Sequence, residues 1–152
     1  MISKDSASES LAGYEFSWPL GVSSARITAQ QVMDIFKAHP EDIFPFDIRL
    51  DPNRRIKLGA VLNLYPLVVR REPVEVVDET PTSFTFISLP GHIHGSGATI
   101  QFSIDAEREQ LYLGQKALFR HSRFVSEAIK GVASLLWSQQ ARNLSRKVIL
   151  SL

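Results

Sequence analysis

TSFTFISLPGHIHGSGATIQFSI, residues 82–104, contains two apolar segments separated by a turn rich in glycine. Apolar side chains occupy every second position of both segments, at Phe84, Phe86, Ile100, Phe102 and Ile104. This alternation is typical of β-strands that bury one face. The turn between the segments carries Pro90 and glycines, which suit the backbone conformations of a tight connection. The stretch therefore predicts two neighbouring antiparallel strands.

The composition is that of one ordinary globular domain. The chain has 152 residues, of which 44% are hydrophobic and 22% charged. A net charge of +1 provides no strong field, so we expect no nucleic-acid partner. Cysteine is absent, which excludes disulfides and cysteine-based zinc sites and fits a cytoplasmic location. No apolar segment approaches the roughly 20 residues of a membrane span.

The N-terminal region is expected to divide into a tail and a first strand. Residues 1–13 are rich in serine and small polar residues, so we predict a flexible tail followed by a single domain over residues 14–152. Tyr14, Phe16 and Trp18 alternate with polar residues, which indicates a short strand. Pro19 and Gly21 are expected to end that strand.

The middle of the chain predicts one helix and several strands. Thr28 and Gln31 have the spacing of a capping box and open a helix that ends at His39-Pro40, with a short helical turn over residues 41–44. Period-two apolar patterns then predict strands over residues 46–50, 56–64, 67–77 and 111–119. Pro73 suggests an edge position or a bulge.

The C-terminal region predicts a long helix over residues 122–148, with Ser122 as its N-cap. Its apolar residues form two stripes that are offset by one residue, Val125, Ile129, Val132 and Leu136, then Trp137, Ala141, Leu144 and Val148. Such a rotating stripe is expected when a curved sheet embraces a helix. Gln139, Gln140, Arg142 and Asn143 are expected on the polar side, facing solvent or the sheet edge, with the alternative that one of them reaches into a cavity. The element order predicts an α+β domain with an antiparallel sheet and one long helix.

This order, from Tyr14 to Val148, resembles the helix-grip superfamily of START-like, polyketide-cyclase-like and plant-allergen-like proteins, also called SRPBCC domains. The resemblance implies a curved antiparallel sheet of about seven strands wrapped around the C-terminal helix. A narrower resemblance, to an uncharacterised bacterial and plant family, rests on Leu89-Pro90-Gly91-His92 and Phe102-Ser103-Ile104-Asp105. That narrower family has no established reaction to transfer.

The superfamily resemblance also implies a small hydrophobic molecule or lipid as ligand, in a cavity between sheet and helix, and no cofactor. The residues expected to line the cavity are Phe84, Phe86, Phe102, Tyr112, Val132, Leu136 and Trp137. The alternative is that these side chains fill an ordinary core, because every domain of this size needs such residues.

His92 and His94 are the candidate reactive groups. Two residues apart on an extended backbone, their Cα atoms lie about 6 to 7 Å apart and their side chains point to the same side. Two imidazoles so placed can share a metal ion if a further ligand comes from elsewhere. The residues considered for that role are Asp47, Glu72, His121 and Glu127. Alternatively, His92 can act as a general base, since the ordinary pKa of histidine lies near neutrality.

Three function classes therefore stay open. The first is a small-ligand-binding domain without catalysis, which requires a continuous apolar cavity. The second is an enzyme of cyclase or hydrolase type that uses His92 or His94, with or without a metal. The third is an interaction or inhibitor module with a protein partner, which requires an exposed apolar patch. The chain contains neither a nucleophile elbow nor a phosphate-binding loop.

Overall fold

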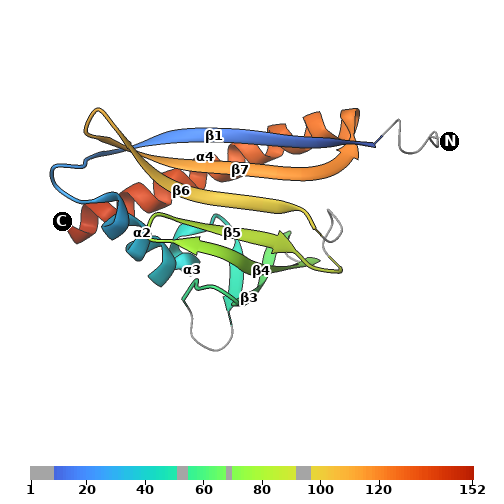
Figure 1. Cartoon of the computed structure of the whole chain (residues 1–152), viewed down its shortest axis with the longest axis horizontal. Coiled ribbons are helices and arrows are strands. Elements are labelled where there is room, and N and C mark those ends of the chain that lie inside the picture. The colour runs from blue at the N-terminus through green and yellow to red at the C-terminus, as the bar shows by residue number, and fades with distance from the viewer. Residues whose placement is uncertain (1–8, 51–54, 68–69, 92–96) are drawn as a thin grey trace.

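The computed structural model describes residues 9–50, 55–67, 70–91 and 97–152. The elements follow one another as β1 (Glu9–Ser23), α2 (Ala29–Ala38), α3 (Pro40–Ile43), β2 (Asp47–Leu50), β3 (Val61–Leu67), β4 (Arg70–Thr80), β5 (Ser83–Ser88), β6 (Thr99–Glu107), β7 (Gln110–Ser122) and α4 (Arg123–Ser151). The strands form one antiparallel seven-stranded sheet in the order β1-β7-β6-β5-β4-β3-β2 (Figure 1). The first strand of the chain therefore pairs with the last.

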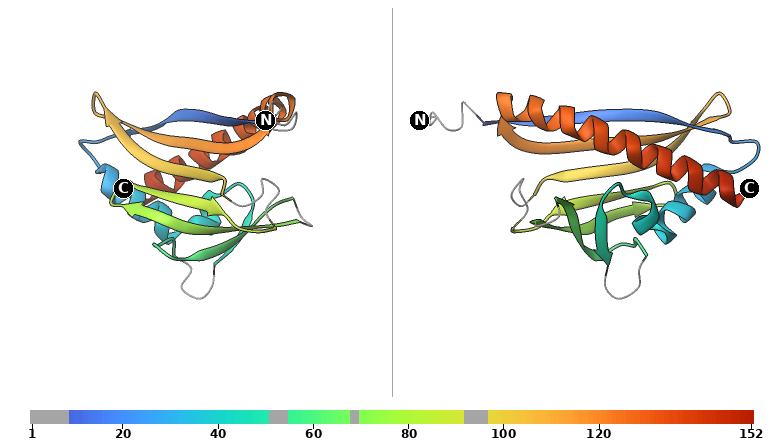
Figure 2. Two further views of the ribbon diagram at one scale, coloured as in Figure 1. Left: turned by 45° about the vertical axis from the view of Figure 1, so that its right-hand side comes forward. Right: turned by 180° about the vertical axis from the view of Figure 1, so that it is seen from behind.

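The sheet is curved, and its concave face is covered by helices. Seen from behind in Figure 2, α4 crosses the sheet diagonally from the β1–β7 side towards α2 and α3. It contacts β1, β7, α2 and α3. The predicted α+β helix-grip architecture, with about seven strands and a long C-terminal helix, is confirmed.

The predicted start of the first helix is also confirmed. The Gln31 backbone N–H donates to Thr28 Oγ1 at 3.0 Å, and the Thr28 N–H donates to Gln31 Oε1 at 2.9 Å. Both bonds satisfy amide groups that a helix N-terminus leaves without an internal partner. The helix ends at His39 because Pro40 begins a separate short helix, α3.

The first strand differs from its prediction at both ends. It begins at Glu9, so residues 9–13 pair with β7 and do not belong to a tail. It also continues past Pro19 to Ser23, with a register irregularity between these two residues where Gly21 adopts a φ of 71°. A proline is tolerated here because β1 is an edge strand, and a bulge absorbs the irregularity.

Two further strand predictions need correction. The strand predicted over residues 56–64 begins only at Val61, and Pro66 lies within it. Pro73 does not mark an edge, because β4 lies between β3 and β5. The Pro73 carbonyl accepts from the Leu89 N–H at 3.0 Å, and the pairing with β5 ends at Ser88. The proline therefore falls where no ladder bond requires its missing N–H.

Aromatic rings form the centre of the core beneath α2 and α3. The ring centroids of Phe36 and Phe84 lie 5.1 Å apart, and those of Phe84 and Phe102 also lie 5.1 Å apart. Phe44 stacks against Phe86 at 6.0 Å. All of these side chains are buried. Their edge-to-face and offset contacts contribute about 0.5–1.5 kcal/mol per pair beyond the burial of apolar area.

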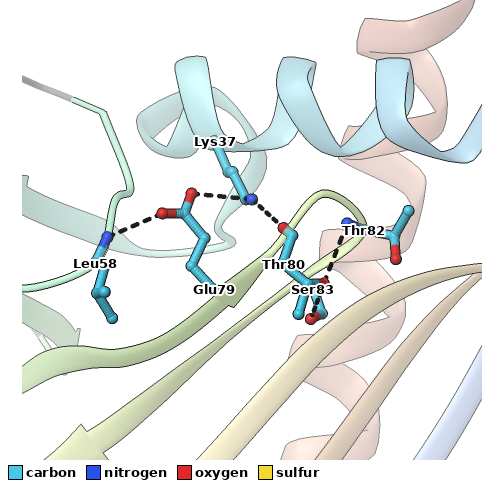
Figure 3. A network of polar contacts seen from close by, with 6 residues as sticks. All are labelled: Lys37, Leu58, Glu79, Thr80, Thr82 and Ser83. Carbon is cyan, nitrogen blue, oxygen red and sulfur yellow. Dashed lines mark hydrogen bonds and ion pairs between the residues drawn. The ribbon is translucent and has the colours of Figure 1, made fainter.

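A buried ion pair attaches α2 to the β4–β5 hairpin (Figure 3). Lys37 is only 3% exposed, and its Nζ lies 3.0 Å from Glu79 Oε2 and donates to the Thr80 carbonyl at 2.7 Å. Glu79 Oε1 accepts from the Leu58 N–H at 3.1 Å. Burial raises the pKa of Glu79, but the hydrogen bonds from Lys37 and Leu58 outweigh burial and hold that pKa below its usual value.

Candidate functional site

Four of the residues predicted to line a cavity lie together under α4. Phe84, Phe86 and Phe102 are fully buried on the concave face, and Trp137 faces them from α4. The ring centroids of Phe102 and Trp137 lie 5.4 Å apart. In this part of the interior the rings pack directly against one another, so they leave no room for a ligand among them.

Val132 and Tyr112 were predicted to line the cavity but point away from the space under α4. Val132 is 60% exposed, whereas its neighbour Ala133 is buried. Consecutive helix residues differ by about 100° in direction, and α4 is held in its rotation by Trp137, so Val132 turns to the surface. Leu136 is half-buried at the edge of the buried stripe.

Tyr112 lies on the opposite face of the sheet from the expected cavity. It alternates along β7 with Leu111 and Leu113, which are fully buried on the concave face. Successive side chains of a strand point to opposite faces, so Tyr112 lies on the convex face with Lys116. It is half-buried there and lines no space under α4.

A chain of polar contacts runs through the apolar interface between the sheet and α4. Trp18 Nε1 donates to Gln115 Oε1 at 2.6 Å. Gln115 Nε2 donates to Gln140 Oε1 at 2.7 Å and to the Trp137 carbonyl at 3.2 Å. This network joins β1, β7 and α4, and both glutamines are buried.

The Trp18 indole determines which atom of each glutamine donates and which accepts. An indole nitrogen only donates, so Trp18 requires the oxygen of Gln115 on its side and leaves the Gln115 amide group facing Gln140. Gln140 must therefore present its oxygen to Gln115 and direct its own Nε2 the other way. Gln140 is 0% exposed, and its Nε2 has no hydrogen-bond partner among the described residues. A buried donor without a partner destabilises the fold by about 1–3 kcal/mol.

A second polar contact lies beside the first. Trp137 Nε1 donates to the Tyr14 hydroxyl at 2.7 Å, which links α4 to β1. Burial raises the pKa of Tyr14 to about 12, although the hydrogen bond from Trp137 lowers it in part. The phenol therefore stays neutral at any physiological pH.

The concave face is less completely covered towards one end. Tyr14, Ala117, Ile100 and Phe86 are paired across β1, β7, β6 and β5 and therefore lie in one row on one face. Tyr14 and Ile100 in this row are half-buried, whereas Phe102, two residues further along β6, is fully buried. Ala117 is buried and small. Half-buried apolar side chains next to a small one mark the place where the packed rings end.

The candidate reactive residues His92 and His94 lie outside the described residues. His121 and Glu127 lie at the β7–α4 junction, where the backbone alone is described. Within the described part of the chain, no three histidine, aspartate or glutamate side chains converge as metal ligands would. Of the candidate further ligands, Asp47 is exposed at the start of the edge strand β2, and Glu72 is buried in β4.

The two buried glutamines were not predicted as site residues, although the sequence contained a signal for each. Gln115 shares its strand face with Leu111 and Leu113. Gln140 follows Trp137 by three residues and precedes Leu144 by four, which is the spacing of the buried helix face. The sequence pattern therefore shows that each glutamine occupies an apolar position of its element, but it does not show that the two glutamines bond to each other.

None of the helices in the described ranges has the length and apolarity needed to cross a bilayer.

Solved structures of known proteins resemble this fold, although no sequence comparison finds a relative. No family model matches the chain, and no curated protein sequence matches it. The solved structure of norcoclaurine synthase from Thalictrum flavum superposes with a TM-score of 0.64 at 9% identity, covering 94% of this chain and 89% of that one. XoxI from Bacillus cereus gives a TM-score of 0.67 at 12% identity, covering 89% of this chain and 94% of that one.

A major latex-like protein from Panax ginseng gives a TM-score of 0.63 at 15% identity, covering 90% of this chain and 96% of that one. These likenesses extend over nearly the whole of each chain. At such low identity they concern the fold alone. The antiparallel seven-stranded sheet that curls around a long C-terminal helix is therefore the Bet v 1-like helix-grip fold.

Proposed function

We propose that this protein binds a small hydrophobic molecule between its curved sheet and α4, and that the molecule carries an oxygen that accepts a hydrogen bond from Gln140. The site lies beside the packed phenylalanines and not among them. Its sheet side is the row that contains Tyr14, Ala117 and Ile100, and Trp137 borders this row from α4. Gln140 lies beside Gln115, which is two residues from Ala117 along β7.

The observation that carries this proposal is the Gln140 amide. Gln115 already has the Trp137 carbonyl as a second acceptor, so it does not need Gln140 to satisfy its Nε2. A leucine at position 140 would avoid the unpaired amide and would suit the surrounding apolar side chains. An unpaired donor at this position lowers the stability of the fold, but it can donate a hydrogen bond to an acceptor on a bound ligand.

The structural neighbours are compatible with this use of the fold. The norcoclaurine synthase structure was determined in complex with dopamine and hydroxybenzaldehyde. Ligand sites built on a mostly apolar wall with a few placed polar groups are the common form of small-molecule site.

Replacing Gln140 with leucine tests the proposal. Nile red is a suitable probe because it is neutral and apolar and carries a carbonyl oxygen. We expect the wild-type protein to bind it saturably and Gln140→Leu to bind it roughly 3- to 10-fold more weakly, since one hydrogen bond is lost. The free energy of unfolding in urea should stay the same or rise by up to about 2 kcal/mol, because the unpaired Gln140 donor is removed and Gln115 keeps its bond to the Trp137 carbonyl.

Gln139→Leu is the matched control. It makes the same chemical change on the neighbouring residue, whose amide bonds to Asn143 and Arg142 at the helix surface. This variant should bind the probe as the wild type does. Native mass spectrometry of the purified protein should also reveal a co-purified oxygenated apolar molecule. Absence of saturable probe binding, or equal affinity in Gln140→Leu and wild type, would contradict the proposal.

The resemblance to the narrower family with the Leu89–His92 turn, the cytoplasmic location, and a catalytic or metal-binding role of His92 and His94 stay predictions. The protein-partner alternative stays a prediction too.

A further inference from the structure

A second feature that can bind a ligand lies outside the interior, where the C-terminal half of α4 runs beside the edge strand β1. A groove of about 610 Å³ opens there, within the range of roughly 300–1,000 Å³ that is usual for small-molecule sites. Its apolar wall includes Trp18 and Pro19 from β1, and Ala141 and Ile149 from α4. From Ser138 to Leu150 the groove follows the helix for roughly 18 Å at about 1.5 Å per residue.

Two cations border this apolar groove. Arg142 and Arg146 both line it, and they lie four residues apart on the same side of α4. Like charges at this spacing repel each other, so the pair is unfavourable without an anion. Neither arginine belongs to the ion pairs of Lys37 with Glu79 or of Lys147 with Asp42, which form elsewhere in the described part of the chain. Arg142 donates at 2.8 Å to the neutral Gln139 side chain.

The groove also exposes apolar surface that the fold does not cover. Ile149 is 52% exposed and Leu150 is 78% exposed, and both lie at the end of the groove beyond Arg146. A guanidinium pair over an elongated apolar groove matches a molecule with a planar anionic head and an unbranched apolar tail. A carboxylate suits the fork of donors on each arginine, and an alkyl chain suits the wall formed by Trp18, Ala141 and Ile149.

We infer that this groove binds the monomer of a medium- or long-chain fatty acid, with its carboxylate at Arg142 and Arg146 and its alkyl chain along the Trp18 side. This site differs from the proposed interior site, because it opens at the sheet edge and its occupant is charged. A membrane surface is the competing occupant, and the vesicle experiment below decides between the two.

The test uses sodium dodecanoate below its micellar concentration and isothermal titration calorimetry. We expect one site on the wild type, with an affinity that rises about two- to fourfold per added CH₂ from octanoate to dodecanoate. Arg142→Glu and Arg146→Glu should each weaken binding by about two- to fivefold, and the double variant should weaken it further. Lys116→Glu, the same charge change on the exposed convex face, should bind as the wild type does.

Nuclear magnetic resonance separates this site from the interior one. The backbone amide signals of Arg146 and Ile149, which line the groove, should shift during the titration, whereas the Trp137 indole signal and the Gln140 side-chain signals should stay in place. Gln140→Leu should leave dodecanoate binding unchanged, so failure of one proposal is distinguishable from failure of the other.

Four outcomes would overturn the inference. They are no saturable binding, equal affinity for dodecanoate and the uncharged dodecanol, shifts confined to the Trp137 side, and association only with vesicles of anionic phosphatidylglycerol. The last outcome would assign the arginines to a membrane surface.

Discussion

Tyr14 accepts a hydrogen bond from Trp137 across the interface of β1 and α4. Together with the contacts of Gln115, this bond sets the rotation of α4 about its own axis. Ala133, Trp137 and Leu144 consequently face the sheet, and Val132 faces outward. A few directional contacts at single residues thus determine that Ala133 and Trp137 are buried and that Val132 is exposed.

Replacing Tyr14 with phenylalanine should destabilise the protein by about 1–3 kcal/mol at neutral pH, because the buried Trp137 N–H loses its acceptor. The pH dependence provides a second measurement. The pKa of Tyr14 is about 12 in the folded protein against 10.0 as the ordinary value. Its stabilising contribution is therefore complete below about pH 10 and is lost as the pH rises towards 12.

Urea denaturation between pH 8 and pH 12 measures both effects. The wild type should lose stability over the upper part of this range more steeply than Tyr14→Phe. If the free energy of unfolding of the two proteins changed with pH in the same way, the raised pKa of Tyr14 would be contradicted.

At the scale of elements, Lys37 determines how α2 sits against the sheet. Its ammonium group is buried and bonds to the Glu79 carboxylate and the Thr80 carbonyl of the β4–β5 hairpin. Glu79 in turn accepts from the Leu58 N–H before β3. Three segments that are distant in the sequence are therefore joined by the side chains of Lys37 and Glu79.

Lys37→Met should destabilise the protein by about 1–3 kcal/mol, since the Glu79 side chain is a quarter exposed and water can partly solvate it. The Glu79 pKa is lowered in the folded state, so its contribution is present above its ordinary pKa and is lost as the pH falls through the folded pKa. Denaturation at pH 7 and in the acidic range should therefore show a larger gap between wild type and variant at pH 7.

A double-mutant cycle with Glu79→Gln isolates the pair. Additive effects of the two substitutions would mean that the ion pair contributes nothing to the attachment of α2.

At the scale of the whole molecule, the sheet has a protected centre and one weak end. The strands β6 and β7 each have a neighbour on both sides, and their concave faces carry fully buried side chains such as Phe102 and Leu113. By contrast, β2 has four residues, pairs only with β3, and forms the far edge. The molecule is therefore held together mainly around β7, which pairs with β1 and packs against α4.

Amide hydrogen exchange should follow this arrangement. We expect the slowest exchange in the centres of β6 and β7, close to the free energy of global unfolding, and exchange in β2 faster by at least about a hundredfold. Exchange measured by mass spectrometry on peptides checks both. Protection of β2 equal to that of β6 would contradict this view of the sheet.

Several features were predictable because they are local. Alternation at Phe84, Phe86 and Phe102 predicted strands and a buried face, and Thr28 with Gln31 predicted the start of α2. Other features failed because they depend on distant partners. The first strand extends to Glu9 since β7 is long enough to pair with it. Tyr112 lies on the convex face because α4 covers the side of Leu111 and Leu113.

The sequence by itself determined the number and order of the main elements and an α+β domain with an antiparallel sheet, and the resemblance to the helix-grip superfamily supplied the curvature of that sheet around α4. Side-chain periodicity and capping reside in the neighbouring residues, so no knowledge of packing is needed to find them. Only the tertiary structure decided which polar groups are buried. Lys37, Gln115 and Gln140 are polar residues whose burial depends on partners 20 or more residues away, at Glu79, Trp18 and Gln115. Those partners exist only when the chain has folded, and the one amide that remains unpaired among them defines the candidate site.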